Sequence, residues 1–463
     1  MPEKGFRAIL VGGGPVGLMA AHTLSRAGID FVLLERRETV VPEQGAGIVL
    51  YPHTLRVLQQ LGLLDAVRTM SLKIHASHVI TKDGHHFVTL HPDRWTREYH
   101  GVGWLFMHRP DLLRLLYSSL PDRVMRQIHA GKDVKEIETT DDGVIVRCSD
   151  GTAESGSIVI GADGVHSNVR GFMFRAMRHN IMQPSANSMP GAEVPEDNRP
   201  FLVTYRCLFG NTAKALPGVN SGESWDMHSA GVASQLFVGE DRTWFLLYQK
   251  LQQPTRERTT YTSNDQDRFV DEVGDAYVTP ALRLRDLYNA RQWSMLLDLH
   301  EGMVDSFSAG RIVLVGDAIN KQAPNHGHGW NCGVQDVVVL TNILSRLVRG
   351  PRTSTCTWSS ASKMHAAFHE YHDTRLSLAK KCQDVSAAVI RGQTWDSWTF
   401  WLVDRYFVPW TGLGKRVYGS ILASVISGGH VLEFLDEGDT PTGSIPWKHC
   451  VRQSVTIRRT EGS

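Results

Sequence analysis

The sequence has almost no net charge and no long apolar run. Its 463 residues include 49 Lys and Arg against 48 Asp and Glu, so no overall field attracts nucleic acid or anionic lipid. No stretch reaches the roughly 18 apolar residues that a membrane span needs. The N-terminus enters an apolar segment without the h-region of a secretory signal. We therefore expect a cytoplasmic protein with no nucleic-acid partner, long enough for two packed domains.

Cysteine is also scarce. The six cysteines are scattered and form no C-x-x-C pair, which excludes a disulfide framework and a zinc site of that type. No C-x-x-x-x-C redox pair is present either, so a disulfide reductase is not expected. There is no internal repeat or low-complexity tract, and only one nucleotide-binding fold is visible in the sequence.

The nearest approach to a membrane segment is 398–410. Asp404, Arg405 and Pro409 interrupt its aromatic residues. These aromatics either form a surface patch for a membrane or an oily substrate, or cover a core. Any membrane contact is expected to be peripheral, for example to an internal membrane.

The first strong signal is a strand, a glycine-rich turn and a helix near the N-terminus. Gly12, Gly14 and Gly17 have G-x-G-x-x-G spacing between the apolar strand 8–11 and an apolar helical pattern. A second strand, 31–34, ends in Glu35, where a carboxylate can bind a ribose diol. The pattern predicts a dinucleotide site at the helix N-terminus and leaves NAD and FAD both open. The alternative is a glycine turn that binds nothing.

Two further segments suit a flat ligand. The small-residue loop 44–50, with Gly47 and Val49, precedes a helical pattern marked by leucines from Leu55 to Leu64. Arg109 stands directly before a helix that opens at Pro110, where a fixed cation could meet a phosphate or a ring oxygen. An ordinary loop explains 44–50 equally well. Arg36 is either solvated or in contact with the adenosine.

Acidic residues follow two more buried strands. Asp163 lies after 157–161 in a run rich in glycine and polar residues, and it either orders the first glycine loop or simply forms a turn. Asp317 follows strand 312–315, and the loop with Pro324, Gly327 and Gly329 opens a helix near Asn331. An acid there can hold a polyol, and a helix N-terminus can stabilise negative charge on a ring carbonyl. His326 and His328 lack a third ligand, so no metal is expected.

The remaining pattern predicts an α/β fold. Hairpins are expected at 76–90 and 134–146, and 201–249 is expected to form a mostly antiparallel β-sheet. This sheet would be a substrate domain interrupting a Rossmann-like FAD-binding or NAD-binding domain, with C-terminal helices behind. Residues 173–200 are expected to be a mobile crossover. The expected parts are nucleotide-binding 1–75, 101–180 and 296–350, substrate-domain 76–100 and 181–295, and helical 351–463.

Together these motifs resemble the FAD-dependent class A monooxygenases of the aromatic hydroxylase type. The resemblance covers roughly residues 6–350. It implies that Gly12, Gly14 and Gly17 hold the pyrophosphate of FAD, and that Asp163 supports both FAD and the encounter with NADPH or NADH. The other implied cofactor contacts are Glu35, Arg36, Gly47, Val49, Arg109, Val134, Asp317, Pro324, Gly327, Gly329, Trp330 and Asn331.

Finer features look like a fungal branch acting on prenylated indole alkaloids, indole diterpenes and meroterpenoids. They include 205–210, 45–50, and Gly428-Gly429 with Leu432, Phe434 and 445–447. The resemblance implies that NADPH reduces FAD, O2 adds as a C4a-hydroperoxide, and an electron-rich C=C of a small hydrophobic substrate takes up the distal oxygen. On an indole 2,3-bond the epoxide could rearrange to a spiro-oxindole. An aromatic hydroxylase, a flavin dehydrogenase or oxidase, and a non-catalytic FAD-binding partner stay open. A monomer is favoured.

The same resemblance marks Arg206 as catalytic, projecting from the chamber wall toward flavin and substrate. Otherwise Arg206 is a salt-bridged strand residue. Tyr205 would point to the opposite face, because side chains alternate along a strand. The sequence departs from the family pattern at Asn320, where His is usual, at His328, where Gln is usual, and at Trp330, where a small residue is usual.

Overall fold

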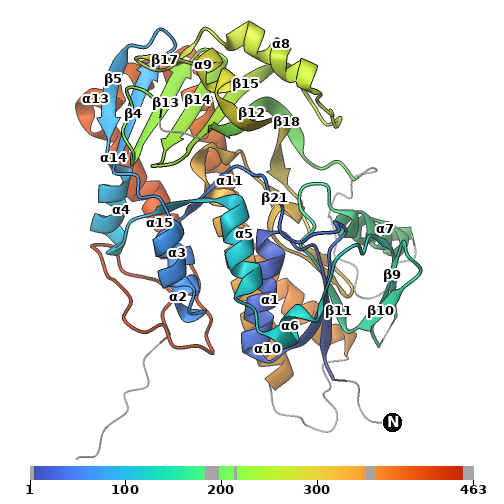
Figure 1. Cartoon of the computed structure of the whole chain (residues 1–463). Coiled ribbons are helices and arrows are strands. Elements are labelled where there is room, and N and C mark those ends of the chain that lie inside the picture. The colour runs from blue at the N-terminus through green and yellow to red at the C-terminus, as the bar shows by residue number, and fades with distance from the viewer. Residues whose placement is uncertain (1–4, 141, 183–197, 213–215, 350–359, 452–463) are drawn as a thin grey trace, which may run out of the picture.

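The protein is built around two β-sheets joined by helices (Figure 1). The computed structural model describes residues 5–140, 142–182, 198–212, 216–349 and 360–451. The first sheet has the order β19-β20-β11-β1-β2-β7 and is parallel except for β19. Its strands are β1 Arg7–Val11, β2 Asp30–Leu34, β7 Ile128–His129, β11 Ile158–Gly161, β19 Ser308–Ala309 and β20 Ile312–Leu314.

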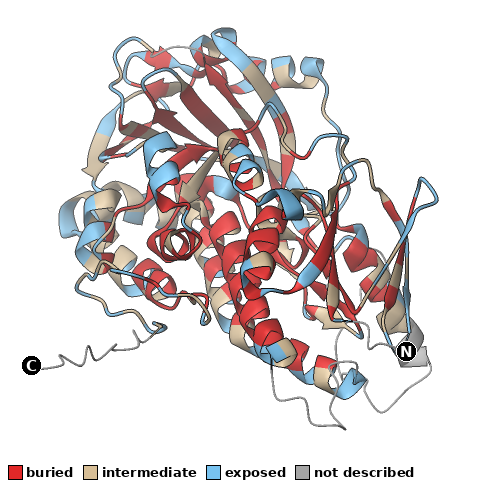
Figure 2. Ribbon diagram, turned by 60° about the horizontal axis from the view of Figure 1, so that its bottom comes forward, coloured by how far each residue is buried: buried red, intermediate tan, exposed pale blue. Residues whose placement is uncertain are grey.

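Helices α1 and α10 pack against each other beside this sheet. Helix α1 (Pro15–Ala27) connects β1 to β2, and α10 (His328–Arg349) starts where a loop leaves the sheet. Both helices are largely buried, as Figure 2 shows. Their apolar residues and those of the parallel strands form one continuous hydrophobic core. The strand–turn–helix that opens the sequence thus lies at the centre of the parallel sheet and its core.

The second sheet has eight strands in the order β21-β18-β12-β15-β14-β13-β4-β5 and is antiparallel except between β13 and β4. Its strands are β4 Ala76–Thr81, β5 His86–Leu90, β12 Leu202–Thr212, β13 Glu223–Ser229, β14 Val232–Val238, β15 Thr243–Thr255, β18 Arg291–Met303 and β21 Asn320–Lys321. The expected α/β architecture with a mostly antiparallel second sheet is confirmed. Strand β18 runs unbroken across residue 295, where the sequence suggested a boundary.

Smaller elements position the loops. Strands β3 Gly47–Leu50 and β6 Leu105–His108 form a pair, and β8 Val134–Thr139, β9 Val144–Cys148 and β10 Ala153–Gly156 form a three-stranded sheet. Strands β16 Tyr277–Thr279 and β17 Leu282–Arg283 pair beside the large sheet. Further helices are α2 Pro52–Gln60, α3 Leu64–Met70, α4 Pro92–His100, α5 Arg109–Ser118, α6 Asp122–Met125, α7 Asn168–Met182, α8 Ser263–Val273 and α9 Leu284–Asn289.

Three local expectations are wrong. The leucine pattern from Leu55 is split at Gly62, whose φ of 76° breaks the helix into α2 and α3. The supposed crossover from residue 173 is helical to Met182, and 183–197 lie outside the described residues. Helix α11 (Ala361–Gln393) is continuous across residue 385, where the sequence pattern suggests that one helix, 371–385, ends and a second, 386–412, begins.

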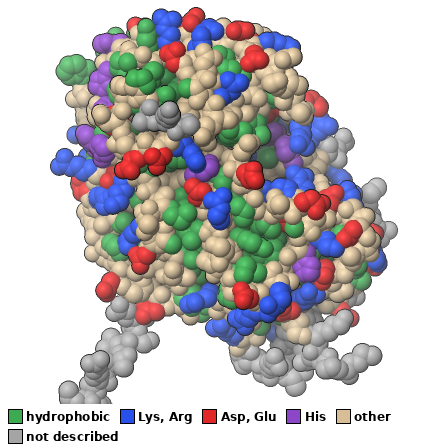
Figure 3. Space-filling model, in the orientation of Figure 1, with side chains coloured by type: hydrophobic (Ala, Val, Ile, Leu, Met, Phe, Trp, Pro, Cys, Tyr) green, Lys and Arg blue, Asp and Glu red, His purple; other side chains and the backbone are tan. Residues whose placement is uncertain are grey.

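After α11 the chain forms short helical pieces. They are α12 Trp398–Leu402, a π-helical turn Val403–Phe407, α13 Val408–Thr411, α14 Leu413–Val417, a second π-helical turn Tyr418–Leu422, and α15 Ala423–Ser427. In the described part of the chain, no helix has the length and apolarity to cross a bilayer. Positive and negative side chains are interspersed over the face in Figure 3, in keeping with the balanced composition.

Candidate functional site

A cavity of about 450 Å³ opens where four parallel strands end. Val11, Leu34, Ala162 and Val315 line it, and each stands at the carboxyl end of β1, β2, β11 or β20 or directly after it. Ligands of open α/β sheets bind at this edge of the sheet. The volume falls in the usual range of about 300–1,000 Å³ for small-molecule sites.

The first glycine turn forms the floor of this cavity. Gly12 has a φ of 108°, and a Cβ there would lie 2.5 Å from the carbonyl oxygen of Ala162, so the turn and the end of β11 approach as only glycine allows. Gly14, in contrast, has no neighbouring atom within 4 Å of an added Cβ. The N-termini of α1 and α10 both reach the cavity, through Gly14 and Gly329. The N–H groups and the positive dipole ends at two helix starts make the cavity suitable for an anion.

Glu35 is buried beside this turn. Its Oε2 accepts a hydrogen bond from the Gly13 amide at 2.5 Å, and its Oε1 accepts from Nε of Arg37 at 2.8 Å. Burial alone would raise the pKa of Glu35, but the bonds from Arg37 and Gly13 outweigh it, so the pKa is lowered. The carboxylate is therefore ionised at neutral pH and can accept hydrogen bonds from hydroxyl groups.

Asp163 follows strand β11 and is hydrogen-bonded to the start of helix α7. Its Oδ1 accepts from the Ser167 hydroxyl at 2.5 Å and its Oδ2 accepts from the Val169 amide at 3.1 Å. Burial raises the pKa of Asp163. The carboxylate thus fixes the start of α7, while the backbone of residues 162–163 lies under Gly12.

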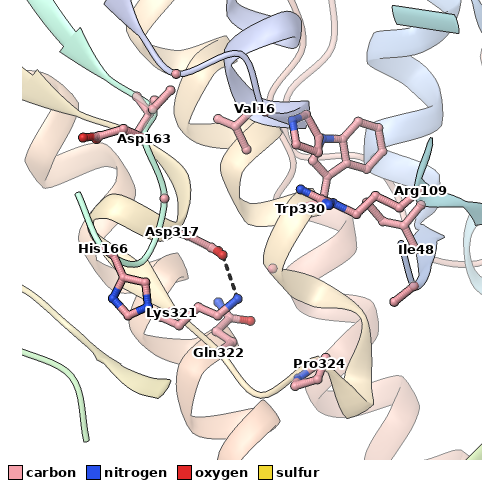
Figure 4. A pocket seen from close by; sticks show the side chains of 18 of the residues that line it. Val16, Ile48, Arg109, Asp163, His166, Asp317, Lys321, Gln322, Pro324 and Trp330 are labelled. Carbon is pink, nitrogen blue, oxygen red and sulfur yellow. Dashed lines mark hydrogen bonds and ion pairs between the residues drawn. The ribbon is translucent and has the colours of Figure 1, made fainter. Parts of the chain in front are cut away.

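Asp317 and Lys321 lie on one side of the cavity. Nζ of Lys321 donates to Oδ2 of Asp317 at 2.7 Å, which Figure 4 shows as a dashed line. The turn that carries Asp317 is fixed to helix α10, because the Gly316 amide donates a hydrogen bond to the buried Asp336 at 3.0 Å. Arg375 of α11 pairs with Asp336 at 2.7 Å. Helix α11 therefore supports the acidic turn although it does not line the cavity.

The pair β3–β6 provides the opposite side. A Cβ built on Gly47 would lie 1.9 Å from Cζ of Phe106, so this position admits only glycine without moving the ring. Arg109 follows β6, and its backbone amide donates to Ala46 at 3.0 Å. Burial lowers the pKa of Arg109, and the neighbouring Arg37 cation lowers it further. Among the described residues, no hydrogen bond or ion pair engages its guanidinium, which lines the cavity.

The antiparallel sheet contributes an almost apolar wall. On β14 and β15 its cavity-lining residues are Phe237, Leu246 and the polar Gln235, and at the edge of the sheet Lys321 of β21 also lines the cavity. Gln235 pairs with Leu246 across β14 and β15, and Phe237 lies two residues further on the same face. This face continues into an aromatic cluster that includes Tyr205.

Arg206 does not reach this wall, and the expectation that it projects into the chamber is wrong. Leu246 stands opposite Phe209, so Tyr205 shares the cavity face and Arg206 points to the other one. There its Nε donates to Gln249 at 2.7 Å and its Nη2 pairs with Glu272 of α8 at 2.8 Å. The sequence predicted that Tyr205 and Arg206 point to opposite faces. It did not predict that α8 packs on the face of Arg206, which leaves the face of Tyr205 toward the cavity.

Most of the other candidate residues line the cavity. They are Gly12, Gly14, Glu35, Arg36, Gly47, Val49, Arg109, Val134, Asp163, Asp317, Pro324, Gly327, Gly329 and Trp330. Gly17 and Asn331 do not line it. Gly17 packs on the carbonyl of Gly12, and the fully buried Asn331 donates to the carbonyls of Val49 and Gly327, both at 2.8 Å. Asn331 therefore ties two lining loops together and does not itself line the cavity.

Several lining residues were not singled out from the sequence. They are Ile48, Phe106, Lys132, His166, Gln235, Phe237, Leu246, Lys321, Gln322 and Asn325, among others. His166 and Lys321 stand within three or four residues of Asp163 and Asp317, so proximity to the motifs could have indicated them. Phe237 and Leu246 carry no local signal, since only the register of β14 and β15 places them there.

Comparison with known proteins agrees with this geometry. Residues 6–199 and 237–373 match the family described as FAD binding domain. The chain belongs to this family of FAD-dependent monooxygenases. It is 31% identical over 453 residues to FAD-dependent monooxygenase dpchE of Colletotrichum higginsianum, covering 96% of this chain and 92% of that protein. It is 32% identical to dpfgE of Gibberella zeae, covering 97% and 93% of the two chains.

Solved structures share the fold at lower identity. Klebsiella pneumoniae HpxO complexed with FAD and uric acid superposes with a TM-score of 0.69 at 20% identity, covering 92% of this chain and 97% of that one. The p-nitrophenol 4-monooxygenase PnpA of Pseudomonas putida gives a TM-score of 0.68 at 18% identity, covering 91% and 97%. These structures show that the two-sheet fold is shared, and membership of the FAD-dependent monooxygenase family rests on the family match and the relatives above 30% identity.

The cavity residues fit the cofactor. Gly14 leaves open space, two helix N-termini face the cavity, and the Arg109 cation has no bonded partner in the described chain. Three buried polar atoms of lining residues also lack partners there: Nε1 of Trp330, Oε1 of Gln322 and Oδ1 of Asn325. These three atoms are closed off from the cavity, so the features that suit the phosphates of a dinucleotide are the open turn at Gly14, the two helix N-termini and the Arg109 cation.

Proposed function

We propose that the cavity binds FAD along the edge of the parallel sheet and oxidises a hydrophobic substrate against the antiparallel sheet. Gly12 and Gly14 with the start of α1 would receive the pyrophosphate, and Glu35 the adenosine ribose. Asp317 would hold the ribityl and phosphate region, exchanging its bond from Lys321 for one from a hydroxyl. Gly47, Val49, Gly327 and Trp330 would enclose the flavin ring, and Arg36 and Val134 the adenosine side.

The reaction that we propose is epoxidation of an electron-rich C=C by molecular oxygen. The single observation that carries it is the apolar surface formed by Phe106 of β6, Phe237 of β14 and Leu246 of β15, where β14 and β15 contribute one polar lining residue, Gln235. Such a wall suits a prenylated indole or a terpenoid. When bound, FAD supplies the reduction of oxygen and its transfer. The chain itself would orient the substrate and exclude water, without a charged side chain from this wall.

Aromatic-ring hydroxylation is the second candidate. The fold neighbours include p-nitrophenol 4-monooxygenase, whose printed name gives a phenolic substrate. The apolar wall disfavours a charged phenolate, because an ion brought there would lose hydration without a partner.

NADPH is the reductant that we propose. A second cavity of about 270 Å³ adjoins the first through His166 and is lined by Arg170, Arg199, Arg256, Arg258 and His300. Glu257 is the acidic residue of this lining, and it pairs with Arg199 at 2.5 Å. Burial and, to a smaller extent, the Arg258 cation lower the pKa of His166 to about 4. An excess of guanidinium groups favours the additional phosphate of NADPH over NADH. Arg258→Gln should therefore raise the KM for NADPH several-fold more than that for NADH.

Oxygen-18 labelling tests the proposed reaction. The FAD-loaded enzyme would be incubated with NADPH, ¹⁸O₂ and a panel of prenylated aromatics and indole alkaloids, with product mass spectrometry. We expect one ¹⁸O atom in an epoxide or its rearrangement product. An oxidised product without label would show a dehydrogenase or oxidase. A labelled phenol would show a hydroxylase.

Arg109→Met tests the cofactor part. Loss of a guanidinium that meets a charged or polar ligand group costs about 1.5–3 kcal/mol, so FAD affinity should fall by about tenfold or more. Flavin fluorescence titration of the apoprotein measures it. Arg114→Met is the matched control, since Arg114 is 57% exposed and, among the residues that the structure describes, forms an ion pair with Asp111 alone. Equal affinities for the two variants would contradict the proposed FAD position.

A further inference from the structure

The chain from Trp398 to Val417 is apolar in sequence and exposed in structure. This apolar hairpin comprises α12, the π-helical turn Val403–Phe407, α13 and α14, with a turn at Gly412. None of its residues is buried. The indoles of Trp398 and Trp410 are 73% and 83% exposed, and Tyr406 and Phe407 are about half exposed. Contiguous exposed apolar side chains of this kind mark an interaction surface.

The hairpin is fixed to the body of the protein at its base. Asp404 accepts hydrogen bonds from His228 of β13 at 2.9 Å and from Nε1 of Trp395 at 2.8 Å. Further along, Leu422 and Ile426 are buried in the aromatic cluster that contains Tyr205. The apolar side chains therefore face outward from an anchored element, beside β4 and β5 in Figure 1.

The charges around the hairpin are not balanced. Its single carboxylate, Asp404, is hydrogen-bonded as above. On the neighbouring helix α4, which packs near Tyr418, Asp93 pairs with Arg97 at 2.7 Å and Glu98 pairs with Lys415 at 2.8 Å. In the described chain no carboxylate pairs with the exposed Arg94 and Arg416, whereas the guanidinium of Arg405 stacks over the Phe87 ring at 4.6 Å and its Nη1 is buried. The rim of the apolar surface is therefore net positive.

We propose that the apolar hairpin docks in the plane of a membrane surface that contains anionic lipid. Trp and Tyr favour the boundary between headgroups and acyl chains, where an apolar ring and a polar N–H or O–H are both satisfied. Arginines at the rim reach the headgroups, and anionic lipid attracts each of them. Helical pieces of this length lie on a bilayer and do not span it. The inference does not depend on the substrate proposed above.

Vesicle sedimentation tests the proposal with the full FAD-loaded chain. Vesicles of phosphatidylcholine alone and of phosphatidylcholine with phosphatidylserine serve as the two probes. We expect the wild type to partition more strongly onto the anionic vesicles. Trp398→Ser with Trp410→Ser should weaken partitioning by about tenfold or more on both, because two large apolar side chains lose their burial. Arg416→Gln should weaken it about fivefold on anionic vesicles only.

The control is Met295→Ser on β18, which removes an apolar side chain that is 44% exposed outside the hairpin. It should leave partitioning unchanged. Circular dichroism and flavin content confirm that each variant is folded. Wild-type protein that stays in the supernatant with both vesicles, or a double variant that partitions like the wild type, would overturn the proposal. So would a wild-type dimer that the two tryptophan substitutions dissociate without any vesicle binding, since a second copy would then cover the hairpin.

Discussion

Gly14 and Gly17 belong to one motif but have opposite surroundings. A Cβ on Gly17 would lie 1.9 Å from the Gly12 carbonyl oxygen, whereas one on Gly14 meets nothing within 4 Å. Gly14 also has a φ of −72°, which alanine adopts readily. Gly14 is therefore needed for ligand binding, and Gly17 for the fold.

Alanine substitutions separate these two roles. Gly17→Ala should lower the free energy of unfolding by about 1–3 kcal/mol or more, because the helix is forced away from β1. Gly14→Ala should leave the stability of the apoprotein unchanged and weaken FAD binding by about tenfold, or about 1.4 kcal/mol. Thermal unfolding of the apoprotein and flavin fluorescence titration measure the two effects. Equal losses of stability would refute the distinction.

Arg206 lies outside the cavity and is held by an ion pair. Its ion pair with the half-exposed Glu272 lies on the α8 face, away from the cavity. Arg206→Met should cost at most about 1 kcal/mol of stability. We expect kcat and the coupling of NADPH oxidation to product formation to stay within about twofold, since the pair is screened and remote. A large loss of kcat with unchanged thermal stability would show that Arg206 reaches the reacting groups.

At the scale of elements, α11 and α10 are joined by a fully buried ion pair. Arg375 and Asp336 are only 1% and 2% exposed, and the same carboxylate receives the Gly316 amide. Burial raises the pKa of Asp336, whereas the Arg375 cation opposes that rise. The Tyr371 hydroxyl, one turn earlier on α11, donates to the Leu314 carbonyl at 3.0 Å. The C-terminal helix thus determines the position of the turn that carries Asp317.

Removing one partner of this pair should affect both stability and the cofactor site. Arg375→Met leaves a buried carboxylate unpaired, so we expect the free energy of unfolding to fall by about 3–5 kcal/mol. FAD affinity should fall as well, because the Gly316-Asp317 turn loses its support. Chemical denaturation and flavin titration measure both quantities. Arg346→Met removes two surface ion pairs, with Glu370 and Glu433, Arg346 being 48% exposed, and should cost about 1 kcal/mol or less.

The whole molecule contains many buried, neutral histidines. Burial lowers the pKa of His53 and His430 to about 3 and that of His326 to about 4. In the unfolded chain a histidine titrates near 6.5. Because these folded-state values are depressed, the stability present above about pH 6.5 is lost as the pH falls toward the folded-state values.

We therefore expect acid to destabilise the protein between about pH 6.5 and 4. Each such histidine contributes a slope of up to about 1.4 kcal/mol per pH unit. Asp163 and Asp336, whose pKa values are raised by burial, act in the opposite direction, so the comparison with a variant is decisive. His326→Gln should reduce the slope by up to one histidine's share, as measured by denaturant unfolding at several pH values. An unchanged slope would show that His326 is protonated in the folded protein.

The sequence alone determined those parts of the molecule in which a short stretch of residues is compatible with one local structure. Glycines at G-x-G-x-x-G spacing between a strand and a helix predict the turn at Gly12, and an acid after a buried strand predicts Glu35, Asp163 and Asp317 at the sheet edge. These residues line one cavity because parallel strands all end on the same side. Hairpins at 76–90 and 134–146 were equally local and are confirmed.

Tertiary structure alone decided which face of each element meets the cavity. The alternation of side chains along β12 showed that Tyr205 and Arg206 point to opposite faces of the sheet. Only the tertiary structure shows that α8, which carries Glu272, packs on the face of Arg206, and that the cavity lies on the other face. Asn331 stands one residue after Trp330, yet it clamps two loops while Trp330 lines the cavity. The exposure of the apolar hairpin was likewise undecided, since the same aromatic residues could have covered a core. In each case the outcome depends on contacts between segments far apart in the chain, which local sequence does not encode.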